Sequence, residues 1–230
     1  MADVRDEAVA AEGSSLKVVM IASVAAVGGF LFGYDTAVIN GAVGALEATF
    51  QAGDTAIGLS VSSALIGSAI GAFMGGQLAD RLGRIRTMVV ASVLFSASAL
   101  GSGLAFGLVD FSLWRLVGGV AVGMASVIAP AYIAEIAPAH LRGRLGSLQQ
   151  LAIVTGIFSA LLVDYGIAAG AGGSAQNPFW LGLGAWRWML LSELPVAILY
   201  GIGALMIPES PRYLVAKHRD EKAREVLRSI

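Results

Sequence analysis

The stretch Gly75-Gly76-Gln77-Leu78-Ala79-Asp80-Arg81-Leu82-Gly83-Arg84-Ile85-Arg86 decides the fold of this chain. It places one acid, three arginines and a glycine turn between two long apolar segments, residues 56–79 and 85–106. Each of these charges would cost about 2.5–3.5 kcal/mol at the centre of a bilayer. The stretch therefore predicts a short loop in water that joins two membrane-spanning helices.

The composition is typical of an integral membrane protein. Hydrophobic residues make up 57% of the 230 residues and charged residues 13%, whereas soluble domains carry about 25% charged residues. A helix needs about 20 mostly apolar residues to cross a bilayer, so the sequence predicts an all-α membrane protein with six transmembrane helices. The six segments are residues 16–39, 56–79, 85–106, 111–134, 145–168 and 185–207.

The distribution of positive charge predicts the orientation of these spans. All of the 15 Lys and Arg residues except Arg115 and Arg187 lie in or beside the N-terminus, the second and fourth loops, or the tail. These regions share one side if the spans alternate, and the positive-inside rule makes that side cytoplasmic. Both termini are therefore expected in the cytoplasm. The absence of a long outer loop favours a bacterial plasma membrane.

Three parts are expected along the chain. Residues 1–15 are predicted to be a disordered cytoplasmic lead, and their acidic character argues against a cleaved signal peptide. Residues 16–207 form the transmembrane domain, whose two triplets of spans have opposite orientations because three is odd. This predicts the 3+3 inverted repeat of many secondary transporters. Residues 208–230 break the last span and begin an amphipathic cytoplasmic linker helix.

Several kinds of chemistry have no support in the sequence. The chain has no cysteine, which excludes thiolate metal sites and disulfides. Its two histidines, His140 and His218, have no metal-ligand spacing. We find no nucleophile–base pair and no phosphate-binding loop. We therefore expect neither an enzyme nor a protein that binds a metal, a cofactor or nucleic acid.

Four ionisable residues fall within the predicted spans: Asp35, Arg115, Asp164 and Glu193. Asp35 lies in the outer half of the first span and Arg115 lies four residues into the fourth, so the two can reach similar depth. Beside Arg115 the Asp35 carboxyl stays ionised, whereas loss of that contact in an apolar pocket favours its protonated form. Proton coupling is one interpretation; a static ion pair, or two groups that never meet, is the other. Glu193 fits a hydrogen bond between helices or a functional role equally well, and Asp164 is near enough to its span's end to reach water.

Gln149 and Gln150 begin the fifth span on a face that can point at a polar cavity. An amide side chain offers both a donor and an acceptor, which suits a ligand rich in hydroxyl groups. On this basis alone, contact with a ligand is the less favoured of the possible roles.

Four stretches carry a resemblance to a known family. Residues 29–35 read Gly-Phe-Leu-Phe-Gly-Tyr-Asp, residues 130–143 begin Pro-Ala-Tyr-Ile-Ala-Glu-Ile-Ala-Pro and end Arg-Gly, and residues 208–212 read Pro-Glu-Ser-Pro-Arg. Together with the loop at residues 75–86, and in this order, they resemble the signatures of the sugar porter family of the major facilitator superfamily. The resemblance covers nearly the whole chain.

The resemblance implies import of a monosaccharide, a hexose or pentose, coupled to protons by alternating access. Asp35 matches the family's proton-coupling aspartate, and Arg115 matches the arginine that pairs with it. Gln150 matches a glutamine that hydrogen-bonds the sugar, Ile157 matches a position lining the same site, and Phe32 matches an aromatic residue near the pocket. Isoleucine at position 157 resembles the glucose carriers and favours a hexose such as glucose.

Five further residues match a cytoplasmic salt-bridge cluster that forms in the family's outward-facing state. An exposed ion pair contributes only about 0–1 kcal/mol, so such a cluster can break and re-form in each transport cycle. Control of topology by positive charge is an alternative that is compatible with this role. The residues are Asp80, Arg84, Glu135, Arg142 and Glu209.

The chain departs from the family in length, because sugar porters have twelve spans. The C-terminal six-helix domain is absent, and a fragment of a longer protein is the simplest account. The expected partners are a monosaccharide, protons, membrane lipid, and a second six-helix half or a homodimer mate. An alternative function is a non-transporting membrane interaction module that pairs with itself or with a full-length porter. Drug/proton antiport is a third, which the motifs at residues 130–143 and 208–212 disfavour.

Overall fold

The computed structural model describes residues 2–139 and 141–229, with side chains described from residue 16 onward. In this part of the chain the regular structure is helical, and one isolated bridge joins Pro178 to Gly184. The helices are α1 (Ala2–Phe50), α2 (Asp54–Leu82), α3 (Arg84–Gly103), α4 (Leu108–Ile136), α5 (Arg142–Gly170), α6 (Ala185–Leu191), α7 (Glu193–Met206), α8 (Pro211–Ala216) and α9 (Asp220–Ser229).

The six predicted spans are confirmed. Helices α1 to α5 each hold one span, and α6 with α7 holds the sixth, which runs over Ala185–Met206. Ser192 separates α6 from α7 but keeps helical dihedrals, φ −65° and ψ −17°. The last span is therefore one nearly continuous rod that is interrupted at a single hydroxyl-bearing residue.

Helix α1 extends beyond the predicted span. It continues from residue 39 to Phe50 through a segment that holds three alanines, a leucine and a glutamate and that includes no proline. It stops before Gln51, whose φ of 50° is left-handed. The backbone of residues 2–15 belongs to α1 as well. The side chains of that segment lie outside the described residues, and its predicted disorder stays a prediction.

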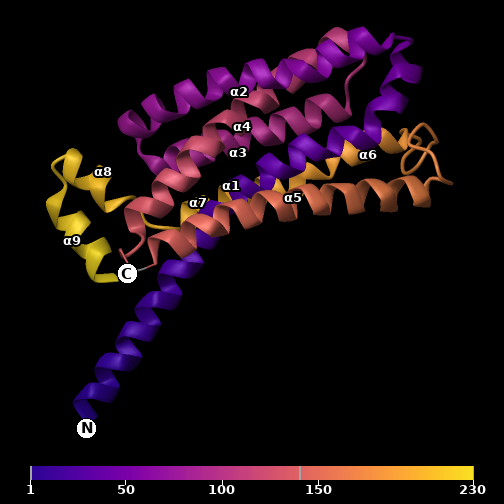
Figure 1. The fold of residues 1–230 in the computed structure, drawn as a ribbon. Coiled ribbons are helices and arrows are strands. Elements are labelled where there is room, and N and C mark those ends of the chain that lie inside the picture. Colours follow the sequence, from indigo (N-terminus) through magenta and orange to yellow (C-terminus); the bar gives the residue numbers. More distant parts are fainter. Residues whose placement is uncertain (1, 140, 230) are drawn as a thin grey trace.

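Helices far apart in the sequence form the bundle (Figure 1). Helix α2 packs along α4, α1 packs along α5, and α3 contacts both α4 and α7. In an inverted repeat of three helices, α1 corresponds to α4 and α2 corresponds to α5. The contact of α1 with α5 is then the counterpart of the contact of α4 with α2. The predicted 3+3 arrangement is therefore visible in the packing.

Both of these pairs use glycine to bring two helices together. A Cβ on Gly71 of α2 would collide with the Val120 backbone of α4, and a Cβ on Gly156 of α5 would collide with the Phe30 backbone of α1. Small residues at such points allow close backbone approach, which favours helix association in lipid through van der Waals packing.

Two apolar clusters fill the interior, one toward each end of the bundle. One includes Phe95 and Tyr132, and the other includes Phe111 and Trp186. Along α1, α4 and α7 the positions between the two clusters hold buried charged residues. The charged groups are thus enclosed by apolar packing on both sides.

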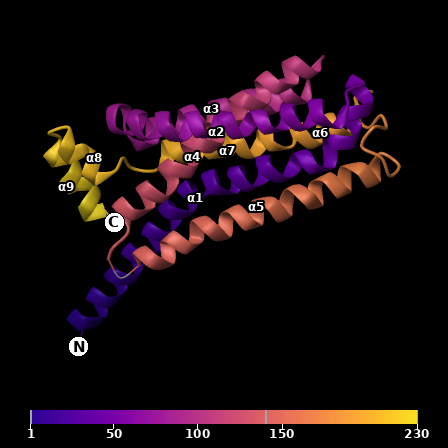
Figure 2. The same cartoon turned by 45° about the horizontal axis from the view of Figure 1, so that its top comes forward.

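Helices α8 and α9 lie at one end of the bundle, opposite the loop at residues 171–184 (Figures 1 and 2). The sequence predicts one amphipathic helix in this region, whereas the structure forms two short ones. The chain breaks between them because His218 has a φ of 57°, a left-handed conformation that a right-handed helix does not accommodate.

Candidate functional site

An ion pair between Asp35 on α1 and Arg115 on α4 lies at the centre of the charged region. Arg115 Nη1 donates to Asp35 Oδ1 at 2.6 Å, and Nη2 donates to Oδ2 at 3.1 Å. The Arg115 and Asp35 side chains are only 4% and 3% exposed. Paired donation to both carboxylate oxygens is the strongest form of such a contact. The two residues therefore meet, which excludes the alternative that they stay apart.

Gly118 gives α4 room to bring Arg115 to this position. A Cβ on Gly118 would collide with the Ser98 side chain of α3 and would come within 3.6 Å of Asp35 Oδ1. Ser98 Oγ in turn donates to the Trp114 carbonyl at 2.9 Å. Helices α1, α3 and α4 thus converge on the ion pair through one small residue and one hydroxyl.

Glu193, the first residue of α7, is the third charged group of the site. Its side chain is only 3% exposed, and its charged neighbours are Asp35 and Arg115. Among the described residues, neither its Oε1 nor Arg115 Nε has a hydrogen-bond partner. We call Asp35, Arg115 and Glu193 the polar layer. The sequence left the role of Glu193 open, and its position inside a span was the signal.

The charge of the polar layer does not balance when every group is ionised. Two carboxylates then face one guanidinium, which leaves one excess negative charge. Burial of an uncompensated charge is very unfavourable in a low-dielectric interior. One proton on Asp35 or Glu193 removes the excess. The arrangement is therefore able to hold a single exchangeable proton.

A pair of hydroxyl groups lies beside the polar layer. The hydroxyls of Tyr34 and Ser192 are 2.6 Å apart, and Ser192 Oγ donates to the Met189 carbonyl at 2.5 Å. Tyr34 therefore donates to Ser192. Since Tyr34 precedes Asp35 and Ser192 precedes Glu193, this hydrogen bond links the two acidic segments of α1 and α7.

The predicted sugar-contact residues share one side of the α1–α5 pair. These helices run parallel: α1 packs along Gly33, Ala37 and Gly41, and α5 packs along Gly156, Ala160 and Asp164. We call this contact line the α1–α5 seam. In a pair of parallel helices, a residue that directly precedes a contact position on one helix points to the same side of the pair as a residue that directly follows a contact position on the other. The residues so placed include Phe32, Gln150 and Ile157.

The exposure of these three side chains differs. Gln150 is exposed, Ile157 is 37% exposed, and Phe32 is partly buried against the apolar core. Gln149, which the sequence also predicts as a sugar contact, is 8% exposed and its amide lies against Gly29 of α1. The structure thus places Gln150 on the open face and Gln149 in the interface between helices.

Two polar residues on the same face of α1 were missed by the sequence analysis. Thr36 and Asn40 follow Phe32 at intervals of four residues, and both are exposed. Thr36 Oγ1 donates to the Phe32 carbonyl at 2.7 Å, and Asn40 Nδ2 donates to the Ala37 carbonyl at 2.9 Å. The i, i+4, i+8 spacing was the available signal. These side chains extend the polar part of the open face.

A second group of interactions lies at the α8–α9 end of the bundle and is centred on Arg84. Arg84 Nη2 is 2.9 Å from Glu135 Oε1 and 3.3 Å from Asp80 Oδ1. Glu209 accepts hydrogen bonds from the backbone N–H groups of Arg84 at 3.0 Å and Ile85 at 3.3 Å. A carboxylate at the start of α3 satisfies free N–H groups and complements the helix dipole. We call Asp80, Arg84, Glu135 and Glu209 the Arg84 cluster.

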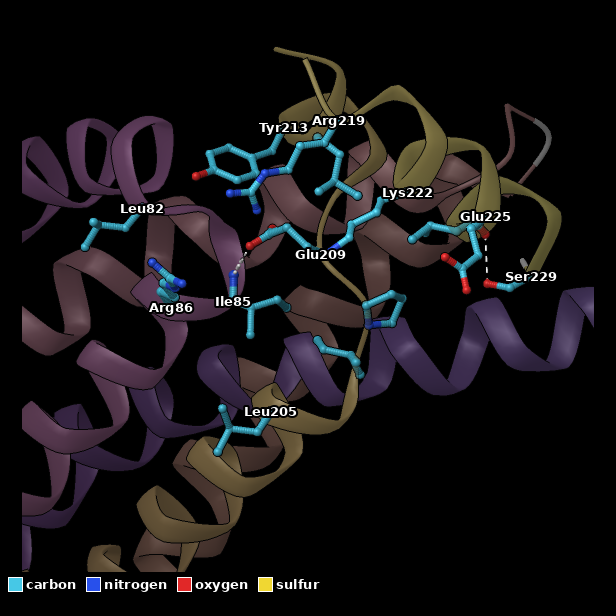
Figure 3. A pocket seen from close by; sticks show the side chains of 14 residues that line it. Leu82, Ile85, Arg86, Leu205, Glu209, Tyr213, Arg219, Lys222, Glu225 and Ser229 are labelled. Carbon is cyan, nitrogen blue, oxygen red and sulfur yellow. Dashed lines mark hydrogen bonds between the residues drawn. The ribbon is translucent and has the colours of Figure 1, made fainter. Parts of the chain in front are cut away.

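Figure 3 shows Glu209 directed at the start of α3, in a cavity of about 690 Å³ between α3, α7 and the α8–α9 pair. The turn before α3 requires glycine: Gly83 has a φ of 101°, and a Cβ there would collide with the Glu209 carboxylate. Tyr132 of α4 holds the segment after α7 in place, because its hydroxyl donates to the Pro208 carbonyl at 2.6 Å.

Arg142 does not join the Arg84 cluster in this structure. It is the first residue of α5, its side chain is exposed, and it forms no salt bridge with the residues described. Its position in the first turn after the 137–141 segment leaves it in solvent. Its predicted part in a salt-bridge cluster therefore stays a prediction.

The residues described include no group of three or more His, Cys, Asp or Glu side chains that could hold a metal ion. His140, one of the two histidines considered above, lies outside the described residues. Among the buried charges described, Asp35 and Arg115 pair with each other across helices.

Comparisons with known proteins give consistent matches. The model of the family described as "Sugar (and other) transporter" matches residues 21–230. The glucose transport protein of Synechocystis sp. (strain PCC 6803) is 64% identical over 210 residues, which cover 91% of this chain and 45% of that protein. The D-xylose-proton symporter of Escherichia coli (strain K12) is 39% identical over 236 residues, which cover 91% of this chain and 47% of that protein.

Solved structures agree with these sequence matches. The proton:xylose symporter XylE, a major facilitator superfamily protein solved with 6-bromo-6-deoxy-D-glucose, superposes with a TM-score of 0.87 at 38% identity. The match covers 94% of this chain and 50% of that one. The chain thus spans about half the length of the relatives that it matches.

Proposed function

The chain belongs to the sugar (and other) transporter family and has the fold of the N-terminal half of a major facilitator protein, and from this premise we propose that the complete protein imports a monosaccharide together with protons. The observation that supports coupling to protons is the buried Asp35–Arg115 pair, with Glu193 beside it. A passive carrier has no need of an uncompensated buried acid.

Proton binding changes the contact between α1 and α4. When the acids share no proton, Arg115 holds Asp35 through two charge-assisted hydrogen bonds. A proton on Asp35 weakens that contact, because a neutral carboxyl attracts a guanidinium less strongly. Helix α1 is then freer to move relative to α4. The protonation state of the polar layer thereby shifts the balance between conformations, as alternating access requires.

The open face of α1 and α5 supplies one wall of the sugar site. Gln150 offers a donor and an acceptor to sugar hydroxyls, Ile157 and Phe32 offer apolar contact, and Thr36 and Asn40 add polar groups. A hexose such as glucose is the proposed substrate. Ile157 supports this choice, as does the 64% identity to a glucose transport protein.

The Arg84 cluster is proposed to hold the cytoplasmic side closed while the site faces outward. The Asp80 side chain of this cluster is 76% exposed, so its ion pair with Arg84 is weak enough to break during a cycle. Arg142 would join the cluster only in another conformation. Protonation, sugar binding and opening of this cluster are then successive events of one cycle.

The proposed setting is a plasma membrane, with both termini in the cytoplasm, as the distribution of Lys and Arg favours. A second six-helix half would supply the opposite wall of the sugar site; in this proposal it is the missing C-terminal domain or, failing that, a homodimer mate. The matches to transporters disfavour a non-transporting interaction module. No enzymatic reaction is proposed.

The proposal is tested by sugar uptake in cells or proteoliposomes that contain the complete protein. Wild type should accumulate sugar when the outside is more acidic than the inside and should lose this ability with a protonophore. Asp35→Asn should still exchange internal for external sugar but should not accumulate it. Accumulation by Asp35→Asn at the wild-type level would exclude Asp35 as the coupling residue.

A further inference from the structure

Asp164 on α5 is a buried acid that the proposed mechanism does not use. The sequence suggested that it reaches water, but its side chain is only 5% exposed. Both of its carboxylate oxygens lack a hydrogen-bond partner among the described residues. The three salt bridges found in this part of the chain involve other acids. An acid in such a place needs an explanation.

The α1–α5 seam accommodates this acid specifically. The successive contact positions of α5 in the seam are Gly156, Ala160 and Asp164. A carboxyl thus follows the two smallest residues. On the α1 side, Gly41 lies directly under the carboxyl, and a Cβ there would press on Asp164 Cγ. Glycine at position 41 makes the space in which the Asp164 carboxyl fits.

The surroundings of Asp164 favour its protonated form. An ionised carboxylate without a partner is very unfavourable in a buried site, whereas the neutral acid avoids most of that penalty. Gly41 offers only backbone groups, and Tyr165, the next residue, is 74% exposed. Tyr34 lies about two turns before Gly41 on the same face of α1.

The position of Asp164 relates it to the polar layer. Gly41 lies six residues beyond Asp35 on α1, which corresponds to about 9 Å along the helix. Asp164 lies six residues before the end of α5, so it stands partway between that end of the bundle and the ion pair. Tyr34, the residue before Asp35, is hydrogen-bonded to Ser192, the residue before Glu193.

We propose that Asp164 is a proton-holding site of the transport cycle, placed on the outer side of the polar layer and supplying it with protons. This inference rests on the proposed function and adds a residue to it. A proton from the outer water forms an O–H bond on Asp164. When that bond breaks, the proton passes inward by way of the Tyr34 and Ser192 hydroxyls, and an O–H bond forms on Glu193 or Asp35. Each hydroxyl on the way accepts one proton and releases its own, so one O–H bond breaks for every O–H bond that forms.

The test compares two variants with wild type in proteoliposomes that contain the complete protein. Asp164→Asn keeps the shape of the side chain. Asp164→Ala introduces the residue that stands at the preceding contact position of α5, Ala160. Two rates are measured: exchange of sugar without net proton movement, and uptake driven by a proton gradient over a range of external pH. Tyr165→Phe, on the exposed side of α5, is the matched control.

Both variants should exchange sugar at nearly the wild-type rate. Their proton-driven uptake should be slower by about a hundredfold, the lower end of what a positioned proton-transfer group contributes, and its dependence on external pH should shift. Unchanged uptake with an unchanged pH profile would overturn the inference. So would a parallel loss of exchange and uptake, which would show a packing role. Absence of proton-driven uptake in wild type would instead contradict the proposed function.

Discussion

Arg115 holds Asp35 through two guanidinium nitrogens, and this contact joins α1 to α4 between the two apolar clusters. A buried ion pair contributes little net stability, because the desolvation of both charges offsets their attraction. Removal of one partner is different, since it leaves the other charge buried alone. The pair is therefore sensitive to single substitutions and tolerant of paired ones.

Arg115→Gln should destabilise the fold more than any conservative change nearby. The variant leaves Asp35 and Glu193 buried without a cation, which we expect to lower the free energy of unfolding by about 3–5 kcal/mol. Addition of Asp35→Asn should restore part of the loss, because fewer buried charges then lack a partner. Unfolding of wild type, of each single variant and of the double variant in detergent gives the coupling energy, and strictly additive effects would contradict the buried pair.

Glu193→Gln should abolish the excess charge of the polar layer. Asp35 and Arg115 then balance each other, so the layer no longer needs a proton to be neutral. We expect the pH dependence of proton uptake by the purified protein to flatten, as measured with a pH indicator. Asp54→Asn, at an exposed acid at the start of α2, is the control. An indicator response identical to wild type would remove Glu193 from the proton site.

Much of the architecture could be predicted because its signals are local. Six apolar runs, the charged loop around Arg84 and the bias of Lys and Arg each follow from the solvation of nearby residues. The sequence also offered Asp35 and Arg115 as a possible pair, because buried opposite charges inside a membrane favour pairing, and it left open that the two never meet. The position of each charged residue along its span also limited which residue could pair with Asp35.

Features that depend on packing between helices were not predictable in the same way. Gln149 and Gln150 are neighbours in sequence, yet the seam buries one against Gly29 and leaves the other open. The burial of Asp164 depends on Gly41, more than a hundred residues away in the sequence. The break at His218 depends on one backbone torsion. None of these has a marker within its own segment.

Gln150→Ala should weaken sugar binding, whereas Gln149→Ala should not. Gln150 lies on the open face, and the loss of one or two hydrogen bonds to a sugar hydroxyl corresponds to about a tenfold rise in KM. Gln149 faces α1, so its truncation acts on packing and should alter the unfolding temperature with little change in KM. Initial uptake rates over a range of sugar concentrations give both KM values. A larger rise in KM for Gln149→Ala than for Gln150→Ala would indicate that Gln149, and not Gln150, contacts the sugar.

Gly83→Ala should destabilise the turn between α2 and α3. Alanine at a φ of 101° is strained by about 1–3 kcal/mol, and its Cβ would displace the Glu209 carboxylate from the N–H groups of Arg84 and Ile85. The start of α3 then loses its acceptor, so we expect a lower midpoint of thermal unfolding in detergent. We also expect impaired transport, because the Arg84 cluster no longer connects α3 to the segment after α7. Gly76→Ala on α2 is the matched control, since a Cβ there meets no atom within 4 Å and its effect should stay within about 0.5 kcal/mol. Equal unfolding midpoints for the two variants would show that neither the positive φ of Gly83 nor its contact with Glu209 contributes to stability.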